Sequence, residues 1–221
     1  MEYFIAALVG YVCGSIPAAY ILARLFKGVD IRTVGSGNVG SSNVWSQVGK
    51  LSYAATLGFD MLKGALPFLW LRGMGYDLSA QVVAGLAAII GHNWPLWLRF
   101  VGGRGIATTG GVLFMLGATE TILTGLIVGV GSALKLGPQT VLLAFLAWPL
   151  WAWGLSGAPT VVRVGSFCVW LLLLARRLQG SRALQATPTT EAVYWNRLWL
   201  DRDMRDKAEW MRRRGTTQSD V

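Results

Sequence analysis

Long apolar runs recur along this chain from its first residues to residue 175, and few charges interrupt them. Only 14% of the residues are charged, whereas a soluble domain carries about 25%. Inside a bilayer no water is available to bond the backbone, so each run must pair its own N–H and C=O groups, as an α-helix does. The sequence therefore predicts an all-α integral membrane protein.

The apolar runs divide into about seven predicted transmembrane helices, several of them shorter than the ~20 residues that cross hydrocarbon unaided. Short spans beside glycine-rich loops predict irregular backbone that is buried in protein. We expect a membrane-embedded domain over 1–175, a basic cytoplasmic tail over 176–221, and a first span that is retained rather than cleaved. The predicted spans are 3–25, 51–71, 78–97, 106–118, 122–134, 141–155 and 161–175.

The formal net charge of +9 follows the pattern of a membrane protein. Lys and Arg gather in alternate loops between the predicted spans and after residue 175, which is the positive-inside pattern. This pattern predicts an N-terminus outside, a cytoplasmic C-terminus, and cytoplasmic positions for the two glycine-rich loops described next. Contact with anionic lipid headgroups accounts for the cations, so no nucleic acid is expected as a partner.

The first glycine- and hydroxyl-rich loop covers residues 34–43, Val-Gly-Ser-Gly-Asn-Val-Gly-Ser-Ser-Asn. Glycine allows the backbone to approach an anion closely, and Ser36, Asn38 and Asn43 can bond phosphate or hydroxyl oxygens. Arg32, just before the loop, can add positive charge. The alternative is a flexible surface loop, which does not account for so compact a set of polar groups.

The second glycine-rich loop reads Gly102-Gly103-Arg104-Gly105 and leads into Ile106-Ala107-Thr108-Thr109. Free N–H groups at the start of a helix, together with one arginine and two threonines, can hold a phosphate. The spacing and the Lys-Ser/Thr ending of a P-loop are absent. A tight turn between spans would explain the glycines alone, so the whole set favours phosphate binding.

Three further polar residues fall inside or at the ends of predicted spans. Asp60 and Lys63 lie three apart and share a helix face, which favours a structural ion pair over a catalytic role. His92, the only histidine, precedes the second loop by ten residues and is either an interfacial hydrogen-bonding residue or an acid–base group. With one histidine and no cluster of Cys, Asp or Glu, a protein-bound metal is not expected.

These residues resemble the bacterial membrane glycerol-3-phosphate acyltransferases that use acyl phosphate as donor. The resemblance covers roughly residues 5–115, in order and at matching spacing. The matching segments are Gly14-Ser15-Ile16-Pro17, Val29-Asp30-Ile31-Arg32, Gly35-Ser36-Gly37-Asn38-Val39-Gly40 with Asn43, Asp60-Met61-Leu62-Lys63-Gly64 with Pro67, Gly91-His92 with Trp94-Pro95, and Gly102-Gly103-Arg104-Gly105-Ile106-Ala107-Thr108.

The resemblance implies a bacterial inner-membrane enzyme without metal or cofactor, whose site faces the cytoplasm. Its partners would be acyl phosphate, glycerol 3-phosphate and membrane lipid. The fatty acyl group would pass to the 1-hydroxyl of glycerol 3-phosphate, giving lysophosphatidic acid and phosphate. The oligomeric state stays open.

We expect the site residues to divide into three groups. His92, Ser36 and Arg104 are expected to be catalytic. Acyl phosphate is expected to bind Gly102, Gly103, Arg104, Gly105, Ile106, Ala107 and Thr108. Glycerol 3-phosphate is expected to bind Arg32, Ser36, Gly37, Asn38 and Asn43. The base is either His92 or the acceptor's own phosphate, whose second pKa is near ~6 as in phosphoserine.

The sequence departs from the family pattern at positions that would grip the acceptor. The family has an arginine where this chain has Ser46, and a His and an Asn where the nearest alignment gives Arg177 and Gly180. Arg104 replaces the usual lysine of the second loop. A relative with a different acceptor or no activity is therefore one alternative, and a small anion transporter is another.

Overall fold

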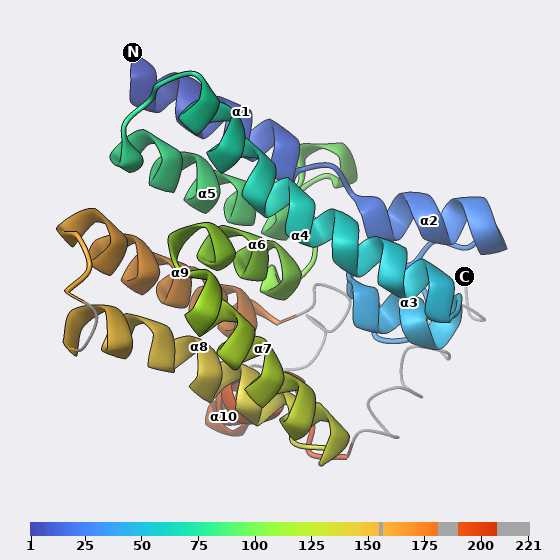
Figure 1. The fold of residues 1–221 in the computed structure, drawn as a ribbon. Coiled ribbons are helices and arrows are strands. Elements are labelled where there is room, and N and C mark those ends of the chain that lie inside the picture. The colour runs from blue at the N-terminus through green and yellow to red at the C-terminus, as the bar shows by residue number, and fades with distance from the viewer. Residues whose placement is uncertain (155–156, 181–189, 207–221) are drawn as a thin grey trace.

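The computed structural model describes residues 1–154, 157–180 and 190–206. The described parts are helical, without β-strands, so the predicted all-α class is confirmed, while the count of about seven spans stays a prediction (Figure 1). The elements are α1 (Glu2–Gly14), α2 (Ala18–Lys27), α3 (Ser41–Gln47), α4 (Lys50–Gly73), α5 (Leu78–Asn93), η1 (Leu96–Leu98), α6 (Ile106–Leu116), α7 (Ala118–Ala133), α8 (Gly137–Gly154), α9 (Thr160–Gln179) and α10 (Glu191–Leu200).

The first predicted span is broken into two helices. Helix α1 ends at Gly14, and Pro17 caps the start of α2. Because proline has no N–H and its ring clashes with the preceding turn, a continuous helix cannot run through this position without distortion. Among the described residues, the stretch Glu2–Lys27 is the one that is long and apolar enough to qualify as a candidate membrane span by length and composition.

Small residues allow the helices to approach closely. A Cβ atom at Gly10 or Gly14 of α1 would overlap the backbone of Ala84 or Ala88 of α5. A Cβ atom at Gly64 of α4 would likewise overlap the carbonyl oxygen of Thr108 in α6. Glycine and alanine at such spacing are the usual means by which membrane helices pack without a hydrophobic driving force.

Helix α6 occupies the middle of the molecule, with α1, α4 and α5 on one side and α7 and α8 on the other (Figure 1). It contacts α4, α5, α7 and α9. Its residues Val112 and Leu113 belong to a buried cluster that joins four helices: Ile89, Val112, Leu113, Phe145, Trp148 and Val169. The glycine-rich loop that precedes α6 is therefore fixed to the core of the bundle.

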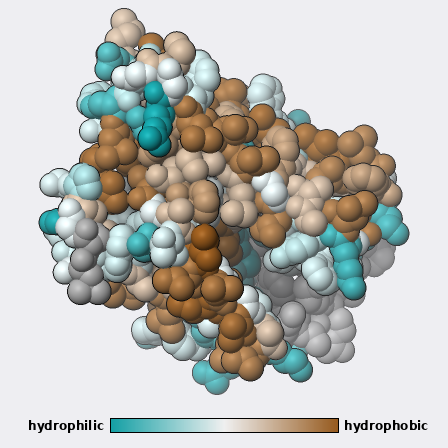
Figure 2. Space-filling model, viewed as in Figure 1, coloured by the Kyte–Doolittle hydropathy of each residue, from teal (hydrophilic) through white to brown (hydrophobic). Residues whose placement is uncertain are grey.

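The exterior of the helices is strongly apolar (Figure 2). Large aliphatic and aromatic side chains are exposed along α4, α7, α8 and α9, which an aqueous surface would not favour. Those most clearly on the outer faces are Leu62, Leu66, Leu69, Leu123, Leu126, Ile127, Val130, Leu143, Leu150, Val164, Phe167 and Leu171.

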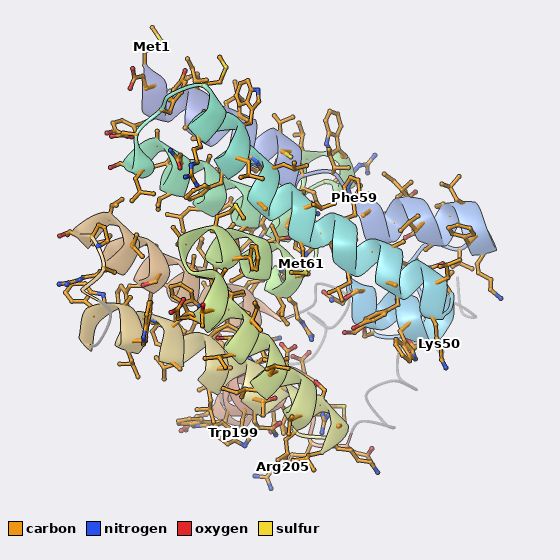
Figure 3. All side chains as sticks on the ribbon, viewed as in Figure 1. Met1, Lys50, Phe59, Met61, Trp199 and Arg205 are labelled. Carbon is orange, nitrogen blue, oxygen red and sulfur yellow. The ribbon has the colours of Figure 1, made fainter. Side chains whose placement is uncertain are left out.

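The chain beyond residue 175 is partly folded against the bundle. Helix α9 continues through the predicted division at 175 to Gln179, and α10 packs against α8 and α9. Trp199 on α10 and Arg205 beyond it lie at the lower edge of the view (Figure 3). The division into 1–175 and 176–221 stays a prediction, and its last part lies outside the described residues.

Candidate functional site

The first glycine-rich loop is organised around one buried amide. Helix α2 ends at Lys27, and its C-cap Gly28 adopts a left-handed conformation (φ 66°) that turns the chain into the loop. The Asn43 side chain, carried by α3, donates from Nδ2 to the carbonyl oxygens of Ile31 (3.0 Å), Val34 (3.0 Å) and Asn38 (3.2 Å). A single side chain thus holds three separate points of the loop.

The carbonyl oxygen of the same amide fixes the most polar part of the loop. Asn43 Oδ1 accepts the backbone N–H of Ser36 at 3.0 Å, and the side chain is 2% exposed. Ser36 and Gly37 are half-buried, and Gly37 has a positive φ of 61°. The role in binding glycerol 3-phosphate that was predicted for Asn43 stays a prediction, because its polar atoms bond the loop itself.

Arg32 is committed to an ion pair beside this loop. Its Nη2 lies 2.7 Å from Asp30 Oδ2, and its guanidinium lies over the ring of Tyr20, 5.2 Å from the centroid. The hydrogen bonds from Arg32 hold the pKa of the Asp30 carboxyl below its ordinary value. Asp30 offsets the Arg32 charge, so the positive charge that this arginine offers an anion is reduced.

The second glycine-rich loop lies against the first. A Cβ atom at Gly103 would meet both the carbonyl oxygen of Val39 in the first loop and the imidazole Nε2 of His92. The Gly103 N–H donates to the carbonyl oxygen of His92 at 3.1 Å. Gly105, with φ 76°, then caps the start of α6. The two loops predicted to form one site are therefore brought together.

Arg176 supports the second loop from α9. Its Nε donates to the carbonyl oxygen of Gly103 at 2.9 Å, and its Nη2 donates to that of Gly102 at 3.1 Å. A third bond runs from Nη1 to the carbonyl oxygen of Gly180 at 2.8 Å. The guanidinium thus ties two successive carbonyls of the loop to the end of α9, a contact that no sequence motif indicates.

The polar residues of α4 and α5 meet below the two loops. Lys63 Nζ lies 2.8 Å from Asp60 Oδ1 and donates to the carbonyl oxygen of Ile16 at 2.9 Å, at the break between α1 and α2. His92 Nδ1 lies 3.5 Å from the same Asp60 oxygen. All three side chains are buried and line a cavity of about 190 Å³ with Ser15. The structural ion pair expected between Asp60 and Lys63 is present.

The geometry of His92 and Thr108 bears on their predicted roles. His92 is buried between Asp60 and Gly103, so its imidazole supports the loop from beneath. The Thr108 side chain has no exposed surface, and within the described part of the chain its hydroxyl has no hydrogen-bond partner. The roles predicted for His92 as a base and Thr108 as a phosphate ligand stay predictions.

An apolar cavity of about 380 Å³ opens beside the second loop. Its walls come from α6, α8 and α9, and its polar end carries Arg104, Arg177 and Asp201. Arg104 Nη1 forms an ion pair with Asp201 Oδ2, and its Nη2 donates to the Asp201 carbonyl oxygen at 2.8 Å. The apolar wall residues are Ile106, Val141, Leu142, Phe145, Trp170, Leu173 and Leu174.

The structure gives physical reasons for the sequence departures. Ser46 Oγ donates to the Asn43 carbonyl oxygen at 3.0 Å, so it closes a turn of α3. Gly180 caps α9 with φ 68°, and a side chain there would collide with the guanidinium of Arg197. Arg177 Nη2 donates to the Pro138 carbonyl oxygen at 2.7 Å. No described group of three His, Cys, Asp or Glu side chains could hold a metal.

Comparison with known proteins gives consistent matches along most of the chain. A family model described as glycerol-3-phosphate acyltransferase matches residues 4–186. Glycerol-3-phosphate acyltransferase 5 of Dehalococcoides mccartyi is 38% identical over 96% of this chain and 94% of the relative. The glycerol-3-phosphate acyltransferase of Methylorubrum populi is 42% identical over 75% of this chain and 83% of its own.

Two solved structures share the fold. The crystal structure of PlsY (YgiH), an integral membrane glycerol 3-phosphate acyltransferase, in its glycerol 3-phosphate form has a TM-score of 0.73 and 29% identity. The match covers 81% of this chain and 90% of the PlsY chain. The lysophosphatidic acid form of the same protein gives a TM-score of 0.71 at 28% identity, covering 81% and 89%.

Proposed function

Because the chain belongs to the glycerol-3-phosphate acyltransferase family, we propose that it transfers a fatty acyl group from an acyl phosphate to the 1-hydroxyl of glycerol 3-phosphate. The enzyme is a membrane acyltransferase. The products of this reaction are lysophosphatidic acid and inorganic phosphate. Acyl phosphate as the donor and the residue roles below are our proposals.

One observation carries the proposal: Arg104 of the second loop lies at the polar end of the apolar cavity between α6, α8 and α9. A donor with a long acyl chain and a phosphate headgroup has this same division into an apolar and an anionic part. We assign the acyl chain to the cavity and the donor phosphate to Arg104 with the N–H groups at the start of α6. The first turn of a helix has N–H groups without intrahelical partners, which suits an anion.

The acceptor is assigned to the first loop, which contacts the second at Val39 and Gly103. Ser36 and Asn38 are polar residues of this loop whose side chains are not bonded by the Asn43 amide. The acceptor hydroxyl oxygen attacks the acyl carbonyl carbon, forming the ester bond as the bond from that carbon to the phosphate oxygen breaks. The acyl phosphate is a mixed anhydride and is already activated, so the enzyme accelerates the reaction mainly by positioning the substrates and stabilising charge.

The acceptor hydroxyl must lose its proton during this attack. The phosphate of glycerol 3-phosphate is a monoester with a second pKa near ~6, as in phosphoserine, so it can take up this proton. His92 is buried beneath Gly103, with its Nδ1 facing Asp60. We therefore assign the proton to a substrate phosphate, and we assign His92 to the support of the second loop.

The proposed setting is the inner membrane of a bacterium, with the N-terminus outside and both loops facing the cytoplasm. The apolar outer faces of α4, α7, α8 and α9 support a position within lipid. The cations that flank the two loops support the cytoplasmic orientation. Phosphorylated acceptors would then reach the loops from the cytoplasm, while the acyl chain enters from the bilayer.

The direct test is acyl transfer by the purified full chain in lipid nanodiscs. Palmitoyl phosphate and radiolabelled glycerol 3-phosphate should yield labelled lysophosphatidic acid, with one phosphate released per ester formed. Palmitoyl coenzyme A serves as the control donor, because it lacks an acyl phosphate bond. Transfer from palmitoyl coenzyme A alone would contradict the proposed donor.

A different acceptor is the second candidate, because Ser46, Arg177 and Gly180 each bond or pack within the protein. The Ser46 hydroxyl and the Arg177 guanidinium are engaged within the protein, and Gly180 has no side chain, so fewer groups remain to bind the phosphate of glycerol 3-phosphate. Running the same assay with glycerol and with dihydroxyacetone phosphate separates the two possibilities. Faster transfer to either of these acceptors would favour the second candidate.

A further inference from the structure

A residue beyond the segment that the family model matches reaches the proposed donor site. The family match ends at residue 186, yet Asp201 forms an ion pair with Arg104 and accepts a second bond at its carbonyl oxygen. Both side chains line the polar end of the apolar cavity. Arg177 Nε lies 3.9 Å from the other carboxylate oxygen of Asp201.

The backbone at the end of α10 directs Asp201 toward this site. Asp201 follows Leu200 with a left-handed conformation (φ 55°) and donates its N–H to the Arg197 carbonyl oxygen at 3.1 Å. Aspartate and asparagine are among the few non-glycine residues that adopt this conformation readily. At this C-cap position, the Asp201 carboxylate reaches Arg104 of the second loop.

Buried polar contacts keep this segment on the bundle. Arg177 Nε donates to the Arg197 carbonyl oxygen at 3.1 Å, and Arg197 Nη1 donates to the Leu178 carbonyl oxygen at 3.1 Å. Arg197 Nε also lies 2.5 Å from Asp203 Oδ1. Because breaking these buried bonds would leave charges without partners, Asp201 stays in place when a substrate arrives.

We propose that Asp201 is a positioning residue, which holds the Arg104 guanidinium in the orientation that receives the donor phosphate. The inference rests on the proposed function. A guanidinium has five N–H donors, and Asp201 accepts from Nη1 and Nη2, which leaves Nε and the remaining Nη hydrogens to the phosphate. Fixing a long side chain in advance removes the rotamer freedom that substrate binding would otherwise have to restrict.

The carboxylate also sets the charge that the donor meets. Arg104 and Arg177 place two cations at this end of the cavity, and Asp201 lies within reach of both. Asp201 therefore offsets part of their charge while it fixes the direction of the Arg104 fork. The donor phosphate is then bound by oriented hydrogen bonds as well as by charge attraction. After transfer, the released phosphate leaves more readily, because Asp201 offsets part of the positive charge of the two arginines.

The test uses Asp201→Asn, which keeps the side-chain size and tolerates the left-handed backbone. Its matched control is Glu191→Gln, which removes the same charge from the exposed start of α10. We expect Asp201→Asn to lower kcat/KM for palmitoyl phosphate about 10-fold, as loss of a supporting contact commonly does. Glu191→Gln should keep the wild-type value.

A double-mutant cycle with Arg104→Ala shows whether Asp201 acts through Arg104. If it does, Asp201→Asn has no further effect in the Arg104→Ala background. Additive effects would overturn the proposal. So would a lower KM for palmitoyl phosphate in Asp201→Asn, because that result means the carboxylate competes with the donor phosphate.

Binding of the non-transferable analogue palmitoyl phosphonate separates this inference from the proposed function. If the wild type transfers no acyl group, the proposed function fails, and binding by calorimetry decides the role of Asp201. If Asp201→Asn binds the analogue about 10-fold more weakly, and this difference is absent in the Arg104→Ala background, the positioning role of Asp201 is supported. Unchanged binding overturns it. If Asp201→Asn does not fold, Asp201→Gly takes its place, since glycine suits the positive φ.

Discussion

Arg176 Nε lies 2.9 Å from the carbonyl oxygen of Gly103, and this bond joins α9 to the loop that precedes α6. The same guanidinium reaches the neighbouring carbonyl of Gly102. A carbonyl pair held in this way cannot turn toward a bound anion.

Arg176→Lys should lower kcat/KM for palmitoyl phosphate by about 10- to 100-fold, in the manner of other supporting contacts. Lysine keeps the charge but lacks the fork that bonds two carbonyls at once. Steady-state kinetics in nanodiscs measure the effect. Arg72→Lys, at the exposed end of α4, is the control and should leave the rate unchanged. Equal rates in the two variants would contradict a role for the fork.

Gly103→Ala should lower acyl transfer about 100-fold, because displacement of a binding loop by about 1 Å can have that effect. The added methyl group would meet the His92 imidazole and the Val39 carbonyl oxygen, so the loop must move. Gly110→Ala is the control, since the described chain places no atom within 4 Å of a Cβ atom there. Similar losses in both variants would mean that the alanine acts through the helix alone.

Asn43→Asp should reduce both activity and thermal stability. The carboxylate cannot donate to the three loop carbonyls that Nδ2 now bonds. The Val34 and Asn38 carbonyls also accept backbone N–H groups, but the buried Ile31 carbonyl would lose its partner, which costs about 1–3 kcal/mol. Unfolding temperature in detergent and kinetics in nanodiscs give the two readouts. Gln47→Glu on the same helix is the control. A higher KM for glycerol 3-phosphate with unchanged stability would instead favour direct binding by Asn43.

Lys63→Met should destabilise the fold by about 3–5 kcal/mol, as removal of one partner from a buried ion pair does. It leaves the Asp60 carboxylate, which is 2% exposed, without its cation. The double variant Asp60→Asn, Lys63→Met should recover part of the loss, because no uncompensated charge remains. Denaturant unfolding in mixed micelles measures both. A double variant no more stable than Lys63→Met would refute this account.

The ion pair between Asp30 and Arg32 predicts a pH dependence of stability. Because the folded pKa of Asp30 lies below the ordinary value of 3.8, the pair stabilises the protein above that value. The contribution is lost as the pH falls through the folded pKa. Between about pH 6 and about pH 3, which lie above and below the ordinary pKa of an aspartate, the unfolding temperature of Asp30→Asn should therefore change less than that of the wild type. Identical changes would show that the pair does not contribute.

The helical class and the two loops could be predicted because they depend on local patterns. Apolar runs require helices in lipid, and glycine with hydroxyl and amide groups in a short run indicates close approach to an anion. The pairing of Asp60 with Lys63 also follows from their spacing on one helix. Each of these inferences needs only neighbours in the sequence.

Contacts between distant segments could not be predicted in this way. The bonds from Arg176 end on backbone carbonyls, which every residue has, so no residue type marks them in the sequence. Asp201 pairs with Arg104 across 97 positions and lies in a segment without a motif. At the break between α1 and α2, Lys63 donates to the carbonyl oxygen of Ile16, a contact between residues 47 positions apart.

The distance along the chain between Gly103 and Arg176 has a consequence for biosynthesis. Seventy-three residues separate them, so at about 5–20 residues per second the ribosome needs about 4–15 s to supply the arginine after the glycine. Until then the carbonyls of the loop must be solvated by water or lipid headgroups. The nascent protein therefore completes this loop only after α6, α7, α8 and most of α9 have been synthesised.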